Sequence, residues 1–187
     1  ITNVSPSSNE PITSCDVVLV VRQIVLEKNV QIQNSDIQIT IDTEGESVFA
    51  QTNAKELSRI LSNLLNNSIE AKDPERGLEI QIFIRQYNKQ VSIVVMDNGV
   101  GIPSDKIALL GQVGVSFGKE QKSDLASHAD NEKNVGSDLK HKSGTGLGLA
   151  HAKQALESWG GHLKIQSSVG IGTQMHLQLP GFEFRKH

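Results

Sequence analysis

Cysteine is nearly absent from this sequence of 187 residues: Cys15 is the single example, so no disulfide can form within the chain. No group of cysteines and histidines has the spacing of a zinc site, and both absences favour a reducing compartment. Apolar runs long enough to span a bilayer, which takes about 20 residues, are also missing. Residues 1–12 lack the basic and apolar blocks of a signal peptide. We therefore expect a cytoplasmic domain and, because the chain starts at Ile1, a longer parent protein that leaves room for an inner-membrane anchor.

An excess of positive charge is missing as well. The chain has 18 lysines and arginines against 21 aspartates and glutamates, and its basic residues are scattered. A nucleic-acid-binding surface needs a positive patch, so we expect no nucleic-acid partner. The length suits one compact domain with its own core better than two.

The pattern of apolar residues divides the chain into a short leader and one domain. Residues 1–14 are polar and rich in proline and serine, which predicts a linker or frayed N-terminal segment before a domain over 15–187. Apolar residues at helical spacing predict helices over 16–30, 53–72 and 147–159. Alternating apolar residues predict strands near 37–41, 48–49, 79–87, 91–96, 162–167 and 174–179. Strands paired in hairpins beside about three helices predict an α+β fold, a two-layer α/β sandwich.

A long polar segment interrupts this pattern. Residues 118–143 mix both charges and contain almost no large apolar side chains, so they cannot contribute much core. A loop of this length inside a compact domain is either disordered or a functional lid. We interpret it as a mobile lid.

The predicted helix over 53–72 has a polar stripe opposite its leucines. At about 100° per residue, Asn63, Asn67 and Glu70 fall within about 60° of one another. Two carboxamides four residues apart present oxygens that suit magnesium, which usually brings phosphates with it. The alternative is an ordinary solvated face.

Two glycine-rich segments follow. In DNGVGIP, Asp97 ends a predicted strand and can accept a hydrogen bond from an exocyclic amine, while Gly99 and Gly101 let the backbone approach a flat ring. In GTGLGLA, over 144–150, free backbone amides precede a helix and favour phosphate binding. This segment matches neither the Walker motif nor the dinucleotide fingerprint. The alternatives are a plain turn and a flexible linker.

Taken in order, these motifs resemble the catalytic and ATP-binding domain of sensor histidine kinases, within the superfamily that includes gyrase, heat-shock chaperones and mismatch-repair proteins. The resemblance covers about Asp16 to Pro180, with LSNLLNNSIEA as the asparagine box, DNGVGIP and GTGLGLA as glycine boxes, and GHLKIQSSVGIGTQMHLQLP as a closing hairpin. It implies a Bergerat-type fold, with a mixed sheet covered by about three helices and an ATP lid, and it implies ATP and Mg²⁺ as cofactors.

The resemblance also implies roles for single residues. Asn67 would ligate the metal, with Asn63 beside the phosphates, and Asp97 would read adenine with support from Thr173. Phe117 would mark the start of the lid. The remaining nucleotide-binding residues that it implies are Gly99, Gly101, Ile102, Thr145, Gly146, Leu147, Gly148 and Leu149.

Two departures from the family pattern matter. Many members have a basic residue where this chain has Glu70. Another residue must therefore neutralise the phosphate charge, and the candidates are Lys72, Lys119, Lys140, His141 and Lys142. The chain also contains no phosphoacceptor helix, because all six histidines follow the asparagine box. We expect all six histidines to lie on the surface, in strands or at the C-terminus, without a functional role.

The implied function is that of a protein-histidine kinase whose catalytic domain donates the γ-phosphate of Mg-ATP to a histidine outside this chain. The implied partners are the parent protein's own dimerisation and phosphoacceptor helices, within a homodimer, and a response regulator receiver domain. Two alternatives stay open: a serine/threonine kinase of the anti-sigma-factor type, and a slow ATPase of the same superfamily. Asn63 stands where hydrolytic members carry a glutamate base, and an amide cannot accept a proton, so hydrolysis should be slow.

Overall fold

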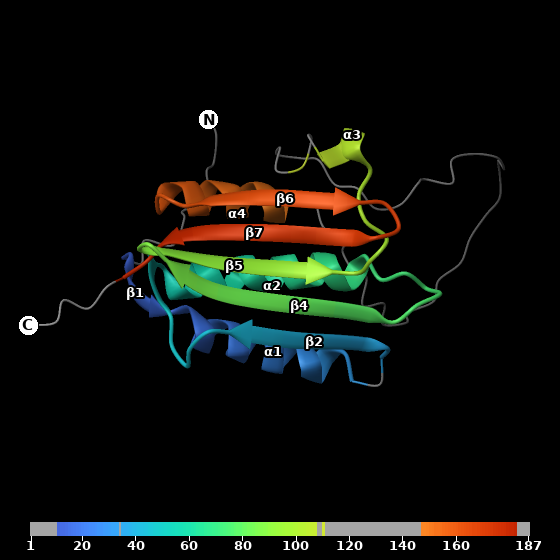
Figure 1. Ribbon diagram of the computed structural model, residues 1–187, viewed down its shortest axis with the longest axis horizontal. Coiled ribbons are helices and arrows are strands. Elements are labelled where there is room, and N and C mark those ends of the chain that lie inside the picture. The colour runs from blue at the N-terminus through green and yellow to red at the C-terminus, as the bar shows by residue number, and fades with distance from the viewer. Residues whose placement is uncertain (1–10, 34, 108–109, 111–146, 183–187) are drawn as a thin grey trace, which may run out of the picture.

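The structure is a computed structural model that describes residues 11–33, 35–107, 110 and 147–182. A five-stranded mixed sheet in the order β2-β4-β5-β7-β6 is covered on one side by three long helices (Figure 1). The helices are α1 (Val17–Gln31), α2 (Ala54–Glu70) and α4 (Leu147–Ser158), and α3 (Ser104–Ile107) is one short turn. The strands are β1 (Thr13–Asp16), β2 (Ile37–Thr43), β3 (Phe49–Thr52), β4 (Leu78–Tyr87), β5 (Gln90–Asp97), β6 (His162–Ser168) and β7 (Gly172–Pro180). The predicted α+β sandwich is confirmed.

The sheet is built mainly from antiparallel hairpins. Only the edge strand β2 runs parallel to its neighbour, β4. β4 and β5 are joined at Asn88 and Lys89, whose φ angles are 47° and 63°. Positive φ at both central residues is the geometry of a two-residue hairpin turn whose twist matches that of the strands. The pairing of these two strands in a hairpin is confirmed.

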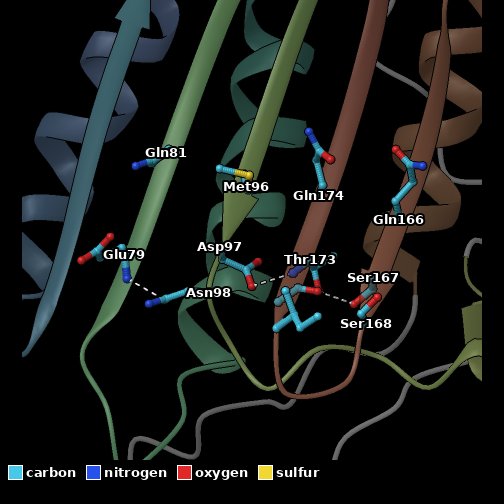
Figure 2. Close-up of a pocket in the computed structure, with 12 residues that line it drawn as sticks. Glu79, Gln81, Met96, Asp97, Asn98, Gln166, Ser167, Ser168, Thr173 and Gln174 are labelled. Atoms are coloured by element: carbon cyan, nitrogen blue, oxygen red, sulfur yellow. Dashed lines mark hydrogen bonds between the residues drawn. The ribbon is translucent and has the colours of Figure 1, made fainter.

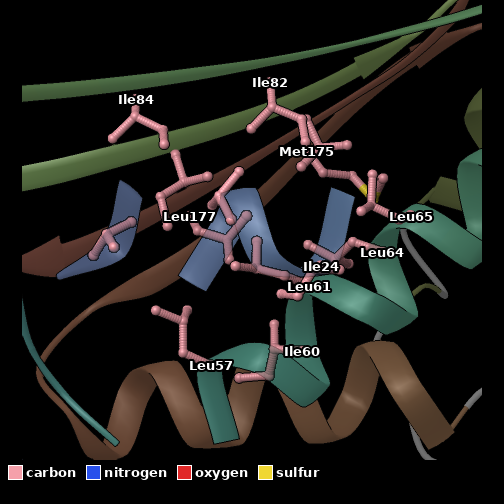
Figure 3. Packing of buried hydrophobic residues seen from close by; sticks show 14 of the residues in the cluster. Ile24, Leu57, Ile60, Leu61, Leu64, Leu65, Ile82, Ile84, Met175 and Leu177 are labelled. Carbon is pink, nitrogen blue, oxygen red and sulfur yellow. The ribbon is translucent and has the colours of Figure 1, made fainter. Parts of the chain in front are cut away.

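The core lies between the sheet and the helices. Every second residue is buried in β5 and, from Leu78 to Ile84, in β4, and α2 inserts one apolar stripe between the sheet and its neighbouring helices. Figure 3 shows this stripe facing the strands; it consists of Leu57, Ile60, Leu61, Leu64 and Leu65. The helix is capped by Asn53, whose side chain accepts a hydrogen bond from the Glu56 N–H at 2.8 Å. Because the leucines pack in the core, the polar stripe of α2 lies on the opposite face of the helix.

One strand begins inside the segment for which the sequence predicts a linker. Thr13 and Ser14 belong to β1, which pairs antiparallel with β3 and buries Cys15. The first 14 residues are therefore not all linker. β1 lacks the apolar alternation of a typical strand, and its pairing with residues 49–52 is not visible in a local pattern. The predicted lid over 118–143 lies outside the described residues.

Candidate functional site

Asp97 ends the central strand β5 and is buried, with 5% of its surface exposed. Its Oδ1 accepts from the Gly99 N–H at 3.0 Å and from the Thr173 N–H at 3.1 Å, and its Oδ2 accepts from the Ser68 hydroxyl at 2.8 Å. Figure 2 shows the contact with Thr173. A carboxylate offers about four lone-pair sites, so these three donors fix its orientation and leave room for one more. Because Ser68 lies on α2, the carboxylate faces the helix side of the sheet.

The glycines after Asp97 are required by close backbone contacts. A Cβ at Gly99 would lie 2.5 Å from the Ala71 carbonyl oxygen, and one at Gly101 would lie 2.1 Å from the Ser168 carbonyl oxygen. Gly101 also has a φ of +72°, which other residues rarely adopt. These two glycines let the loop pack tightly beside the carboxylate and leave bare backbone there.

A pair of hydroxyls lies next to this loop. The Ser167 hydroxyl donates to the Gly172 carbonyl at 2.8 Å and accepts from the Ile102 N–H at 2.8 Å. The Thr173 hydroxyl oxygen lies 2.9 Å from the Ser167 hydroxyl oxygen. Since Ser167 has one proton and gives it to Gly172, Thr173 is the donor in that contact. Thr173 is thus tied to the site through both its backbone and its side chain.

The polar stripe of α2 meets the start of α4. Asn63 and Asn67 are half-buried, whereas Glu70 is exposed. A Cβ at Gly148 would lie 3.5 Å from Asn63 Nδ2, so the first turn of α4 lies directly against Asn63. α4 begins at Leu147 as the sequence predicts, and its leading backbone amides lie on the same side of the sheet as Asp97. The fold therefore brings together three segments that are far apart in the sequence.

Of the residues that could neutralise phosphate charge, Lys72 lies within the described part of the chain. Lys72 donates through Nζ to the carbonyl oxygens of Asp73 at 3.3 Å and Arg76 at 3.1 Å, so it stabilises the loop after α2. The other candidates and three further predicted contacts lie outside the described residues: Lys119, Lys140, His141, Lys142, Phe117, Thr145 and Gly146.

A hollow of about 370 Å³ lies on the opposite, helix-free face of the sheet, at the same end (Figure 2). A row of side chains from four strands crosses it, directly opposite one another in register: Gln81, Met96, Gln174 and Gln166. Asp97 and Thr173 border it, but Asn63 and Asn67 are on the other side of the sheet. The hollow therefore lies on the opposite face of the sheet from the polar stripe of α2.

The pKa shifts in the described residues also lie away from Asp97. Burial lowers the pKa of Lys28, whose Nζ donates to Asn66 Oδ1 on α2 at 2.7 Å. Burial and the nearby Lys164 lower the pKa of His176, which lies on the outer face of β7. Burial raises the pKa of the Cys15 thiol in β1. These groups are structural in position rather than part of the site.

Sequence reasoning missed several residues of the site. Ser68 shares the helical spacing of the leucines of α2, which indicates only a packing position, yet its hydroxyl donates to Asp97. Ser167 and Arg76 were not singled out, although Arg76 donates to the Gly99 carbonyl at 2.8 Å. Each of the three has a partner far away in sequence, at 29, 65 and 23 residues, so co-varying positions in an alignment are the signal that could have indicated these contacts.

Comparison with known proteins identifies the family. Relatives include the circadian input-output histidine kinase CikA of Synechococcus elongatus, 31% identical over 148 residues, and the sensor histidine kinase DcuS of Escherichia coli, 29% identical over 150 residues. Each match covers 78% of this chain but 17% and 23% of the relative. The catalytic domain of the histidine kinase ThkA has the same fold, with a TM-score of 0.71 at 17% identity over 91% of this chain and 98% of that one.

The matched region contains every described residue of the site. Residues 52–182 match the model of the histidine kinase-, DNA gyrase B- and HSP90-like ATPase family. This range includes α2, the loop after β5 and the start of α4, which carry the three motifs. The resemblance inferred from those motifs is confirmed. The chain belongs to the histidine kinase-, DNA gyrase B- and HSP90-like ATPases, as an ATP-binding domain of the sensor histidine kinase type.

Proposed function

We propose that this domain holds Mg-ATP and donates its γ-phosphate to a histidine that lies outside the chain, as the catalytic part of a two-component sensor kinase. The observation that carries the proposal is the buried Asp97 carboxylate. It is oriented by three donors, has one acceptor position left, and is flanked by backbone that only glycine allows. An exocyclic amine of adenine is the donor that this position suits.

The phosphates would extend from this point toward α4. The helix start supplies free N–H groups and the positive end of its dipole, and it lies against Asn63. The crystal structure of full-length ShkA in complex with AMPPNP has the same fold, with a TM-score of 0.68. We infer that nucleotide lies on the helix side of the sheet, between Asp97 and the first turn of α4.

The donor set near Asn67 suits magnesium. Among the described residues there is no group of three or more histidines, cysteines or acids that could hold a metal. Mg²⁺ keeps several waters and needs only one or two protein oxygens when phosphates supply the rest. The half-buried Asn67 amide would be the protein ligand, and the bound ion would neutralise phosphate charge. Its place one turn after Asn63 supports this assignment.

The chain's own residues would act by positioning, which is how proteins mainly promote phosphoryl transfer. The described histidines are poorly placed as acceptors. His151 on α4 contacts Glu56 on α2, His162 lies on the edge strand β6, and His176 is on the outer face. The nucleophile would therefore come from another domain.

The chain spans only about a fifth of the length of the curated relatives it matches. The rest of the parent protein and its partners are therefore part of the same proposal. We infer a homodimer held by upstream dimerisation helices that carry the acceptor histidine. A response regulator would be the next partner; the histidine kinase ThkA has been solved in complex with the response regulator TrrA.

No helix among the described residues is long and apolar enough to cross a membrane. Any inner-membrane anchor would lie elsewhere in the parent protein, with this domain in the cytoplasm.

A phosphorylation assay separates this function from its rivals. The domain is incubated with γ-labelled ATP and magnesium, alone and with the parent protein's upstream helices supplied in trans. We expect no label on the domain alone and acid-labile, alkali-stable label on the helices. Acid-stable label on an added protein would favour the serine/threonine kinase, release of inorganic phosphate alone would favour the ATPase, and acid-labile label on the isolated domain would contradict the missing nucleophile.

A further inference from the structure

Three loops meet at the end of the sheet where Asp97 lies. They comprise residues 71–77 after α2, 98–103 after β5, and 169–171 between β6 and β7. The Val100 N–H donates to the Ala71 carbonyl at 2.8 Å, and the Val100 carbonyl accepts from the Gly170 N–H at 2.8 Å. The middle loop is thus bonded to both of its neighbours.

The guanidinium of Arg76 closes this network. Its Nη2 donates to the Gly99 carbonyl at 2.8 Å and to the Gly170 carbonyl at 3.1 Å. The peptide unit between Gly99 and Val100 is therefore bonded at both polar atoms, its C=O to Arg76 and its N–H to Ala71. Hydrogen bonds from a charged donor are stronger than those between neutral groups, so Arg76 supplies the strongest links in this set.

Arg76 is itself held by its own loop. Asp73 Oδ2 lies 3.5 Å from Arg76 Nε, and Lys72 Nζ donates to the Arg76 carbonyl at 3.1 Å. Lys72 also donates to the Asp73 carbonyl at 3.3 Å. Asp73 thus orients the guanidinium and Lys72 holds the loop backbone, and a residue that positions others needs such support.

We propose that Arg76 is a positioning residue for the nucleotide site. Through the Gly99 carbonyl it holds the residue whose N–H donates to Asp97 Oδ1. Through the Gly170 carbonyl it holds the turn that leads into Thr173, whose N–H is the second donor to that oxygen. Both backbone donors that orient Asp97 therefore belong to segments joined by one guanidinium. The inference rests on the proposed function, because it takes Asp97 to be the adenine-reading group.

Arg85 provides a matched control. Its side chain is 36% exposed, against 38% for Arg76, and it also donates to a backbone carbonyl, that of Asp42, at 3.0 Å. It forms ion pairs with Asp42 and Glu44 at the far side of the sheet, away from Asp97. Replacing either arginine removes a half-exposed charge with carbonyl contacts, but only Arg76 touches the loops of the site.

The test measures the affinities of ATP and GTP, with magnesium, for the wild type, Arg76→Met and Arg85→Met. We expect Arg76→Met to raise the Kd of ATP about tenfold, since a lost hydrogen bond from a charged group has roughly that effect. The Kd of GTP should change little, because guanine lacks the amine that Asp97 would accept from, so the preference for ATP falls. Arg85→Met should leave both Kd values unchanged. A merely structural role of Arg76 would weaken both nucleotides equally.

Asp97→Ala, measured in parallel, distinguishes a failure of the positioning role of Arg76 from a failure of the adenine-reading role of Asp97. If Asp97→Ala loses the preference for ATP and Arg76→Met keeps it, Arg76 is not a positioning residue and the adenine site stands. If Asp97→Ala also keeps the preference, the adenine site itself is wrong. Should Arg76→Met fail to fold, Arg76→Lys replaces it, and hydrogen exchange of the Val100 and Gly170 amides is followed. We expect at least tenfold faster exchange in Arg76→Lys than in the wild type, and unchanged protection would overturn the inference.

Discussion

The two faces of the sheet differ in how they are built at the end of β5. On the helix side, the buried Asp97 carboxylate is held by Ser68, Gly99 and Thr173. The backbone around Gly99 and Gly101 leaves no room for a Cβ atom at either position. On the outer side, the hollow is crossed by the half-exposed side chains of Gln81, Met96 and Gln174. The hollow on the outer face, at about 370 Å³, is larger than the one of about 120 Å³ between α4 and β6 on the helix side, yet the helix side has the constrained chemistry.

This difference shows that a hollow by itself is weak grounds for a site. Strained backbone and a buried, fully oriented acceptor persist only where the surrounding structure enforces them, and they gather at functional positions. The amides of Gln81, Gln174 and Gln166 in the outer row are at least partly exposed, so water can solvate them. The helix side is therefore where substitutions should affect nucleotide, and the outer face should tolerate them.

The largest effect is expected from a methyl group added at Gly101. Gly101→Ala would place Cβ against the Ser168 carbonyl at a φ of +72°, so we expect a loss of about 3 kcal/mol in unfolding free energy and no ATP binding. Gly170→Ala is the control, because its φ is +78° but nothing lies within 4 Å of the added Cβ. That variant should lose only about 1–2 kcal/mol. Urea denaturation measures both, and equal losses would contradict the packing of this loop.

The next effect concerns the metal. Asn67→Ala should remove most of the gain in ATP affinity that magnesium provides, raising the Kd at saturating Mg²⁺ by about tenfold or more. Without magnesium the variant and the wild type should bind alike. Gln81→Ala, an amide removed from the outer row, should leave both values unchanged. A fluorescent ATP analogue titrated with and without Mg²⁺ gives the answer, and an Asn67→Ala variant that keeps the full magnesium effect would remove Asn67 from the site.

The smallest effect is a pH dependence on the outer face. Burial and Lys164 lower the pKa of His176, so the folded state binds fewer protons than the unfolded state just below the ordinary histidine pKa of about 6.5. Stability should therefore fall as pH drops from about 6.5 and level off below the folded pKa, by less than about 1 kcal/mol for this half-exposed group. His176→Gln should flatten the profile and His162→Gln should not, while ATP affinity stays unchanged in both. A profile of unfolding free energy between pH 7.5 and 5 that is the same in all three proteins would contradict this.

Local patterns predicted the elements that depend on local forces. The helix over α2 has a cap at Asn53 and leucines at helical spacing, and the β4–β5 hairpin has a two-residue turn, so both are visible in a short window. Asp97 was identified because a carboxylate followed by two glycines at a strand end is unusual. In each case the neighbours in sequence are also the neighbours in space.

The parts that the sequence did not reveal depend on contacts between distant segments. β1 is a strand because residues 49–52 pair with it, not because its own four residues alternate. Arg76 bonds to Gly170, 94 residues away, and a half-exposed arginine in a loop gives no local sign of such a partner. Ser68 fitted the apolar stripe of α2 by its spacing, which concealed its hydrogen bond to Asp97.

The preference of the domain for ATP over GTP tests the central claim most directly. The wild type should bind ATP with magnesium clearly more tightly than GTP. Asp97→Ala should lose about tenfold to a hundredfold in ATP affinity, the usual effect of removing a buried charged acceptor, and should bind both nucleotides about equally. Asp42→Ala, which removes an exposed carboxylate at the far edge of the sheet, should behave as the wild type. An Asp97→Ala domain that still prefers ATP would show that the buried carboxylate at the end of β5 does not read adenine.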